Sequence, residues 1–360
     1  MIHFHSLAVK KVQRETDDCV SITFNVPPEL QDSFRFRPGQ NLTVRKVLNG
    51  EELRRSYSIC SSPLDGTLRV AVKQVEGGLF STWANTALKA GDTLDVLPPT
   101  GNFTPELDPQ QRKHYVAFAA GSGITPVLSI LKTVLATEPG SRCTLVYGNR
   151  SKGSIIFKEE LEALKDKHID RFRLYHVLSR EKTDAAVNYG RIDRDKCALM
   201  VDKRLLDLDA SDEFFICGPE EMIFCVRDYL QEQGVHPKRI HFELFTIPGQ
   251  KKSQVATEQE AVSDAGPRSQ VQVKLDGIAF DFDLSYDGHS ILDAALKQGA
   301  DLPYACKGGV CCTCKAKLLE GEVIMKENWG LEPDEVAAGY ILTCQAHPRT
   351  GTVVVDFDAK

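Results

Sequence analysis

The chain has 360 residues, of which 42% are hydrophobic and 26% are charged, and its formal net charge is −6. This length suits two or three domains with cores of ordinary composition. The acidic balance argues against a nucleic-acid partner, because phosphate binding requires clustered Lys and Arg.

No targeting segment is evident after Met1, and the longest apolar stretch, residues 115–136, is interrupted by glycines and a proline. Such a stretch favours strand, loop and helix over a membrane span. The 11 cysteines are odd in number and mostly scattered, which favours cofactor ligation in a reducing compartment over disulfides. We therefore expect a cytoplasmic protein with no membrane partner.

Short alternating apolar runs, separated by turn residues, occupy the first part of the chain. The expected strands are 7–12, 20–26, 41–47, 55–60, 67–75 and 93–97. Runs at this spacing predict an antiparallel β-barrel domain over residues 1–107.

Strands alternate with helices in the middle of the chain. The expected strands are 114–120, 143–147, 172–178, 213–216 and 240–245, with helices that include 155–167 and 220–233. This alternation predicts an α/β doubly wound domain over residues 108–248, with ligands at the carboxyl ends of its strands. Residues 249–269, which have little apolar content, are expected to form a linker.

The C-terminal part, residues 270–360, is expected to be a third domain. Its expected strands 271–275 and 278–282 flank Asp276-Gly277, a strong hairpin signal, and a helix with one buried face follows near Ile291. From residue 269 onward there are 14 acidic and 8 basic residues, so this part carries the whole net charge. Such a domain could be steered to a basic docking face, or the charge could simply keep the surface soluble.

Four cysteines in this domain have the spacing of a plant-type [2Fe–2S] ferredoxin. Cys306, Cys311 and Cys314 form the pattern Cys-x4-Cys-x2-Cys, and Cys344 follows thirty residues later. A zinc site would offer two matched Cys-x2–4-Cys pairs, which the sequence lacks. We therefore predict that these four thiolates are the metal ligands.

The residues between these cysteines also suit a cluster. Gly308 and Gly309 can reach positive φ, so that the loop wraps closely and directs N–H groups at the sulfurs. Only one of Cys311 and Cys312 fits the ligand spacing, and we expect Cys312 to pack as a small hydrophobic side chain.

Flavin chemistry is suggested by Arg55, Tyr57 and Ser58, which offer a cation for a pyrophosphate, an aromatic ring and a hydroxyl near flavin N5. The same residues also occur in ordinary strands, so this segment alone is weak evidence for a flavin site. A second segment could present N–H groups and a hydroxyl to the pyrophosphate before a helix. Its residues are Lys73, Gly78, Leu79, Phe80 and Ser81.

A nucleotide-binding loop is predicted after the strand 114–120. Gly121 and Gly123 allow close backbone approach to a pyrophosphate. Thr125 is placed to cap the following helix, and Pro126 fits its first turn. A proline in the sixth position departs from the dinucleotide fingerprint of Rossmann domains.

Two further segments would line the same crevice. The first follows a strand and comprises Cys217, Gly218, Pro219 and Met222. The alternative for Cys217 is a plain buried thiol.

The second segment is Asn149, Arg150 and Ser151, which contains no carboxylate. Arg and Ser suit the 2′-phosphate of NADPH, whereas a carboxylate would favour NADH. A solvated loop arginine is the alternative for Arg150.

In this order, the motifs resemble the ferredoxin–NADP reductase superfamily with a C-terminal ferredoxin domain, as in reductases of multicomponent oxygenases. The likeness spans essentially the whole chain. A closer likeness, to the reductase subunits of bacterial phenylacetyl-CoA epoxidases, is carried by residues 36–40, 51–55, 147–150, 290–311 and 353–360.

The resemblance implies a multidomain protein whose last domain is a β-grasp ferredoxin. It implies FAD at Arg55, Tyr57, Ser58, Gly78 and Ser81, and NADPH at Gly121, Thr125, Arg150 and Cys217. It also makes Phe245 the candidate aromatic residue against the flavin.

The expected function follows from these cofactors. NADPH delivers a hydride to FAD, and single electrons then pass through the cluster to oxygenase subunits. Ser58 and Cys217 are expected to flank the hydride path. The alternatives are NADH as donor, another aromatic-compound oxygenase as partner, or a pure electron carrier. A di-iron oxygenase is disfavoured, because no His has a Glu three residues before it.

Overall fold

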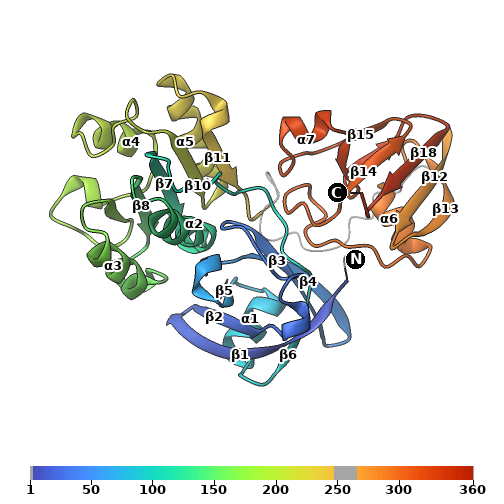
Figure 1. The fold of residues 1–360 in the computed structure, drawn as a ribbon, viewed down its shortest axis with the longest axis horizontal. Helices are drawn as coiled ribbons and strands as arrows, with labels where there is room; N and C mark the ends of the chain where they lie inside the picture. The colour runs from blue at the N-terminus through green and yellow to red at the C-terminus, as the bar shows by residue number, and fades with distance from the viewer. Residues whose placement is uncertain (1–2, 247–265, 360) are drawn as a thin grey trace.

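Three large sheets in sequence order, with a two-stranded sheet beside the third, form three domains in the computed structural model, which describes residues 3–246 and 266–359 (Figure 1). The expected linker, residues 249–269, lies outside the described residues except for its last four positions. The C-terminal domain rests against the barrel on one side, and the α/β domain lies against the barrel on another (Figure 1).

The first sheet is antiparallel and has the strand order β4-β3-β6-β1-β2-β5. All six expected strands are present: β1 (His5–Thr16), β2 (Cys19–Asn25), β3 (Asn41–Leu48), β4 (Glu51–Ser58), β5 (Leu68–Lys73) and β6 (Thr93–Val96). A bridge between Ile59 and Val70 joins the end of β4 to β5 and closes the barrel. Helix α1 (Leu79–Thr86) packs Phe80 and Ala84 into the barrel core.

The second sheet is parallel and has the order β11-β10-β7-β8-β9. Its strands are β7 (His114–Ala120), β8 (Arg142–Asn149), β9 (Phe172–Leu178), β10 (Glu213–Cys217) and β11 (Ile240–Glu243). Its helices are α2 (Ile124–Thr137), α3 (Lys158–Lys167), α4 (Arg194–Asp202) and α5 (Glu220–Glu232). The order changes direction between β7 and β10, the point at which such sheets bind ligands.

The C-terminal domain contains a mixed sheet in the order β13-β12-β18-β14-β16. Its elements are β12 (Arg268–Leu275), β13 (Ile278–Ser285), α6 (Ile291–Lys297), β14 (Lys315–Glu320), β15 (Val323–Met325), α7 (Pro333–Ala337), β16 (Tyr340–Leu342), β17 (Ala346–Pro348) and β18 (Thr352–Asp356). Asp276 and Gly277 form the expected hairpin turn, both with positive φ. Strand β12 begins at Arg268, two residues inside the expected linker, because Arg268 and Ser269 already pair with β13.

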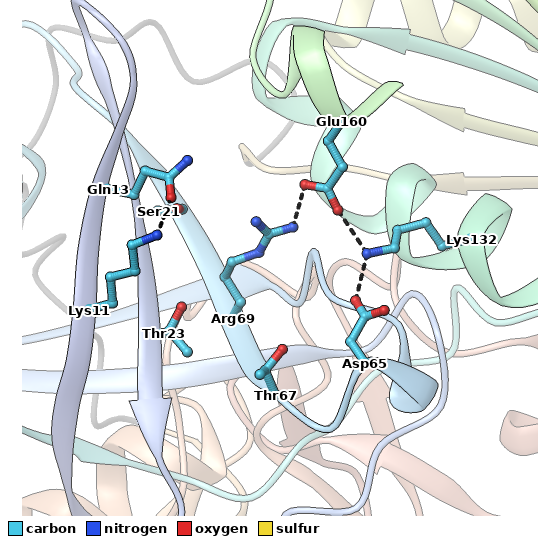
Figure 2. A pocket seen from close by; sticks show the side chains of 9 residues that line it. All are labelled: Lys11, Gln13, Ser21, Thr23, Asp65, Thr67, Arg69, Lys132 and Glu160. Carbon is cyan, nitrogen blue, oxygen red and sulfur yellow. Dashed lines mark hydrogen bonds and ion pairs between the residues drawn. The ribbon is translucent and has the colours of Figure 1, made fainter. Parts of the chain in front are cut away.

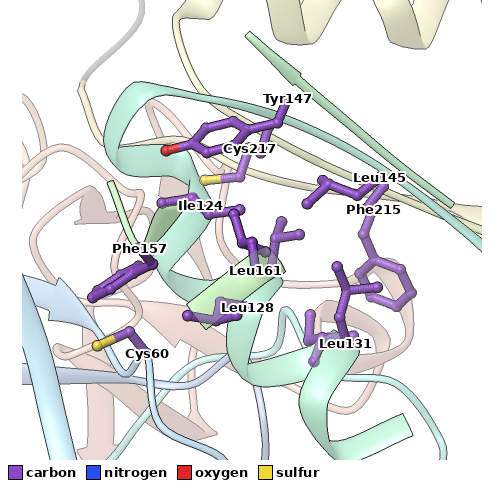
Figure 3. Close-up of a cluster of buried hydrophobic side chains, with 14 of the residues drawn as sticks. Cys60, Ile124, Leu128, Leu131, Leu145, Tyr147, Phe157, Leu161, Phe215 and Cys217 are labelled. Atoms are coloured by element: carbon purple, nitrogen blue, oxygen red, sulfur yellow. The ribbon is translucent and has the colours of Figure 1, made fainter. Parts of the chain in front are cut away.

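The barrel and the α/β domain share one hydrophobic core. Cys60 of the barrel lies beside Phe157 and Leu128 of the α/β domain, and all three are buried (Figure 3). Because interiors are close-packed, a continuous core fixes the relative position of the two domains. None of the helices in the described part of the chain is long and apolar enough to cross a bilayer.

Ion pairs reinforce the same domain boundary beside a cavity of about 270 Å³ (Figure 2). Lys132 on α2 bonds to Asp65 of the barrel at 2.6 Å and to Glu160 on α3 at 2.7 Å. Glu160 also bonds to Arg69 on β5 at 2.6 Å. The four side chains are largely buried, so these pairs are less screened by solvent than surface pairs.

We expect Lys132→Met to destabilise the protein, because it leaves two partly buried carboxylates short of a partner. Breaking such a network should lower the free energy of unfolding by about 1–2 kcal/mol. The measurement is the first thermal transition in calorimetry. Lys11→Met is the matched control, since Lys11 lines the same cavity, is exposed and bonds only within the barrel, to Gln13. Equal effects of both substitutions would contradict the assigned role.

Candidate functional site

Strand β4 presents the candidate flavin residues at its carboxyl end. Arg55 is exposed, whereas the Tyr57 ring packs 5.6 Å from the Phe80 ring. Ser58 is only 4% exposed. The Nη1 atom of Arg55 donates to the carbonyl oxygen of Arg54 at 2.8 Å. One strand therefore offers an exposed cation, a fixed aromatic ring and a buried hydroxyl in sequence.

The hydroxyl of Ser58 donates a hydrogen bond of 2.8 Å to Oε2 of Glu243. Glu243 ends β11, so this bond links the barrel to the carboxyl edge of the parallel sheet. Glu243 keeps some exposed surface, but its carboxyl group is surrounded by protein, and this burial raises its pKa to about 8. The carboxyl group therefore holds a proton at neutral pH.

Sequence reasoning missed Glu243. A signal was present, because an acidic residue at the end of an apolar strand stands at the ligand-binding edge of a parallel sheet. In the structure Glu243 pairs in register with Cys217 on β10. Cys217 is fully buried, and burial raises the pKa of its thiol well above the usual range. Ser58, Cys217 and Glu243 therefore form one group of neutral, proton-bearing side chains.

The pKa of Glu243 predicts a specific pH dependence of stability. Between the ordinary pKa near 4.5 and about 8, the folded protein holds a proton that the unfolded chain has released. Stability relative to Glu243→Gln should therefore fall as pH rises through this window, by roughly 4–5 kcal/mol in total. The measurement is the difference in melting temperature between the flavin-loaded wild type and the variant from pH 5 to 8.5. A constant difference would contradict the raised pKa.

The nucleotide loop lies beside Cys217. Gly121 has a φ of +54°, and a Cβ on Gly123 would collide with the carbonyl oxygen of Cys217. Nζ of Lys73, at the end of β5, stands next to Gly121. The structure thus brings the candidate loop, Cys217 and a barrel cation together at the switch point between β7 and β10.

The expected capping role of Thr125 is wrong. The segment Gly121–Gly123 forms a 3₁₀ turn, and α2 begins at Ile124 without a side-chain cap. Thr125 is already inside the helix, and its hydroxyl donates to the carbonyl oxygen of Ser122 at 3.0 Å. Pro126 does lie in the first helical turn, as predicted.

The segment after β10 closes tightly on the loop. A Cβ on Gly218 would lie 2.6 Å from Cε of Met222, whose side chain is 7% exposed. Pro219 precedes the first residue of α5. These residues form a wall of the crevice rather than a polar lining.

At the carboxyl end of β8, Asn149 is buried and its Nδ2 atom has no hydrogen-bond partner. Arg150 is exposed, and its carbonyl oxygen accepts a bond from the backbone of Arg180. Ser151 precedes a 3₁₀ turn. A carboxylate, Glu181, reaches this edge, but it bonds to Lys152. An unused amide donor and a free guanidinium therefore suit a nucleotide phosphate.

The candidate pyrophosphate segment forms a tight turn before α1. The Ser81 hydroxyl accepts from the N–H of Val75 at 3.1 Å and donates to the carbonyl oxygen of Gly78 at 3.2 Å. Leu79 is half exposed, whereas Phe80 lies in the barrel core. The structure thus gives Ser81 a role in shaping the turn that precedes the helix.

Phe245 lies two residues after Glu243 and is 43% exposed. An exposed aromatic ring next to the Ser58–Glu243 contact is available to cover a planar ligand. Burying such a ring against a flavin would be favourable.

The four predicted ligand cysteines form two pairs. The thiols of Cys306 and Cys311 lie within hydrogen-bond reach of each other, as do those of Cys314 and Cys344. Within residues 3–246 and 266–359, no group of three or more His, Cys, Asp or Glu is arranged around a single ion. An arrangement of the cysteines in two pairs, rather than around one point, suits a centre with two iron atoms, each bound by two thiolates. The N–H of Gly308 also points at the Cys306 sulfur, at 3.3 Å.

The residues around the cysteines partly differ from expectation. Gly309 has the expected positive φ of +74°, but Gly308 does not, and the other positive φ values in the loop fall on Lys307 and Cys312. Cys312 is 6% exposed and lies in the domain core, as predicted. A Cβ on Gly330 would lie 2.5 Å from its sulfur, so that Cys312 faces a neighbouring loop.

Three protein-family descriptions match the chain. They are an oxidoreductase FAD-binding domain over residues 6–104, an oxidoreductase NAD-binding domain over 118–228, and a 2Fe-2S iron-sulfur cluster binding domain over 273–349. These matches define an oxidoreductase that uses FAD, a nicotinamide dinucleotide and a [2Fe–2S] cluster.

Similar proteins share this whole arrangement. The chain is 49% identical over 360 residues to one of the subunits of the 1,2-phenylacetyl-CoA epoxidase of Escherichia coli (strain K12), covering 100% of this chain and 99% of that one. It is 38% identical over 356 residues to the 3-ketosteroid-9-alpha-monooxygenase ferredoxin reductase component of Rhodococcus rhodochrous, covering 98% and 96%. The structure of phthalate dioxygenase reductase has the same fold, with a TM-score of 0.58 at 23% identity over 98% of both chains.

The chain therefore belongs to the ferredoxin–NADP reductase superfamily, in the group of oxygenase reductases with a C-terminal [2Fe–2S] domain. The family expected from the motifs is confirmed, as are the three-domain fold and the classes of cofactor.

Proposed function

We propose that this protein transfers electrons from NADPH, through FAD and its [2Fe–2S] cluster, to the oxygenase subunits of a phenylacetyl-CoA epoxidase. The Ser58–Glu243 bond supports the first step most directly, because it joins the flavin-binding barrel to the nucleotide-binding edge of the sheet. The relative at 49% identity supports the choice of partner. The domain limits 1–107, 108–248 and 270–360 belong to the same proposal.

Bound FAD supplies the conversion between a two-electron hydride and single electrons. The protein supplies the positions. Ser58 and Cys217 flank the hydride path with protons held at neutral pH, and Glu243 orients the Ser58 hydroxyl. Arg55 offers a cation to the pyrophosphate, and Phe245 shields the ring from water.

Anaerobic mixing of the purified protein with NADPH, and separately with NADH, tests this proposal. We expect rapid bleaching of the flavin and then of the cluster with NADPH, and slower reduction with NADH. Cluster reduction by neither donor would refute the reductase function and favour a pure electron carrier. Equal rates with both donors would refute the NADPH preference alone.

Arg150→Leu should weaken the use of NADPH selectively. A charge-assisted hydrogen bond to a 2′-phosphate contributes about 2 kcal/mol, so the KM for NADPH should rise roughly tenfold or more while that for NADH stays constant. Steady-state reduction of an artificial acceptor measures both values. Lys152→Met is the control, because Lys152 is exposed in the same loop but pairs with Glu181. An equal rise for both nucleotides would contradict a 2′-phosphate contact.

Affinity purification from cells grown on phenylacetate tests the partner. We expect the tagged protein to recover the oxygenase subunits of the epoxidase. Recovery of a different aromatic-compound oxygenase alone would refute this partner without affecting the NADPH result.

A further inference from the structure

A buried arginine of the barrel reaches into the C-terminal domain. Arg54, on β4, is 7% exposed. Its Nη1 donates to the carbonyl oxygen of Leu302 at 3.1 Å, and its Nη2 donates to Oδ1 of Asp301 at 3.2 Å. Its guanidinium also lies 4.2 Å from the centre of the Tyr304 ring. One side chain of the barrel thus contacts a backbone carbonyl, a carboxylate and an aromatic ring in the segment that leads to Cys306.

This arginine is costly to bury and therefore needs its partners. A guanidinium removed from water is tolerated only when it is paired and hydrogen-bonded. Within the barrel, its Nε donates to Glu52 at 2.8 Å, which supplies the charge partner. Among the residues that the structure describes, the two terminal nitrogens, Nη1 and Nη2, donate only to the partners in the C-terminal domain that are named above. The planar fork of Arg matches this set of partners, which the ammonium group of Lys would not.

The contact lies where electron transfer requires it. We call residues 306–314 the cluster loop. Thr313 in this loop bonds to Thr43 on β3, with 3.0 Å between the two buried hydroxyl oxygens. Thr43 pairs in register with Ser56, so the cluster loop touches the barrel directly beside the candidate flavin strand β4.

A third contact joins the barrel to the segment that packs beside the cluster loop. Nδ2 of Asn102 donates to Oε2 of Glu335 at 2.6 Å and to the carbonyl oxygen of Gly330 at 3.3 Å. Apolar contacts add to these polar ones, because Trp329 of the C-terminal domain packs against the core of the α/β domain, with its ring centre 5.8 Å from that of Phe224. The C-terminal domain therefore meets the α/β domain partly through apolar side chains and the barrel through hydrogen bonds, which include the charge-assisted bonds described above.

We propose that Arg54 is the positioning residue that docks the cluster loop on the barrel and thereby sets the rate of electron transfer from flavin to cluster. This inference rests on the proposed function. Each transfer moves one electron from the reduced flavin to the oxidised cluster. Two transfers balance one hydride, whose proton passes to solvent. Transfer rates fall steeply with distance, so a loosened loop receives electrons more slowly.

The test compares Arg54→Met with Arg45→Met in the cofactor-loaded protein. Arg45 is a matched control, because it lies on the neighbouring strand β3 and bonds to Asp95 within the barrel. Anaerobic stopped-flow with NADPH resolves flavin reduction and cluster reduction separately. Loss of charge-assisted bonds should slow cluster reduction by about tenfold in Arg54→Met, with flavin reduction unchanged. Arg45→Met should leave both steps unchanged.

Two measurements on the oxidised protein report how firmly the C-terminal domain is docked, in the absence of turnover. Small-angle scattering should show a larger radius of gyration for Arg54→Met, and hydrogen exchange should be faster at residues 301–306. Thr43→Val tests the same interface if Arg54→Met does not fold, and it should shift all readouts in the same direction.

The outcomes separate this inference from the proposed function. Unchanged cluster reduction, scattering and exchange in the variants would overturn the role of Arg54, even if NADPH reduces the flavin normally. If NADPH does not reduce the wild-type flavin, the proposed function fails, and scattering and exchange still decide whether Arg54 docks the domain.

Discussion

Cys344→Ala is expected to abolish cluster assembly and all electron output through the C-terminal domain, while NADPH still reduces the flavin. Cys344 pairs with Cys314, and its loss leaves the second iron with a single protein sulfur. A [2Fe–2S] centre held by three thiolates lacks one tetrahedral ligand and is lost or rapidly degraded. The measurements are iron and sulfide content, the electron paramagnetic resonance signal of the reduced cluster, and the rate of flavin bleaching.

The matched control is Cys312→Ser, because Cys312 is buried to the same extent as Cys344 and lies next to a predicted ligand in the cluster loop. Its sulfur faces Gly330 rather than another thiol, so the cluster should assemble normally. Retention of the cluster in Cys344→Ala would contradict the ligand set. If the cluster were lost in Cys312→Ser but retained in Cys311→Ser, the ligand would be Cys312 rather than Cys311.

Features that depend on short segments were predictable from the sequence. The six barrel strands follow the alternation of apolar residues, because side chains on a strand point to opposite faces in turn. The ligand cysteines Cys306, Cys311 and Cys314 lie within nine residues, so their chemistry shows in their spacing alone. Very short strands such as β15 and β16 were not predicted, because three residues are too few to display a period.

Contacts between distant segments were not predictable. Glu243 meets Ser58 across 185 positions, and Arg54 meets Asp301 across 247 positions. Arg54 has no local pattern that distinguishes it from an ordinary strand residue. The position of Glu243 at the end of a strand indicates a ligand-binding edge but does not reveal Ser58 as its partner. Local sterics also overrode expectation at Thr125, where an early 3₁₀ turn moved the start of the helix. The residues that make contacts between domains can therefore be identified only from the packing of the folded chain.

Ser58→Ala is expected to slow the reduction of the flavin by NADPH by about 10²-fold, because it removes a preorganised hydroxyl group at the reacting centre. Ser58 is buried, and its hydroxyl is held by Glu243 at 2.8 Å, so its orientation costs nothing at the moment of hydride transfer. The substitution also leaves the Glu243 carboxyl group without its partner. Stopped-flow bleaching of the flavin under anaerobic conditions measures the rate directly.

Ser56→Ala provides the control for this effect. Ser56 lies two residues away on β4, but its hydroxyl donates to Asn41 at 2.7 Å within the barrel. We expect its flavin reduction to stay within about twofold of wild type, since surface and half-buried hydroxyls contribute little beyond local stability. A slow Ser58→Ala variant with normal FAD content assigns the loss to the hydride step. Equal rates in Ser58→Ala and Ser56→Ala would remove Ser58 from the hydride path and leave Cys217 as its remaining protein neighbour.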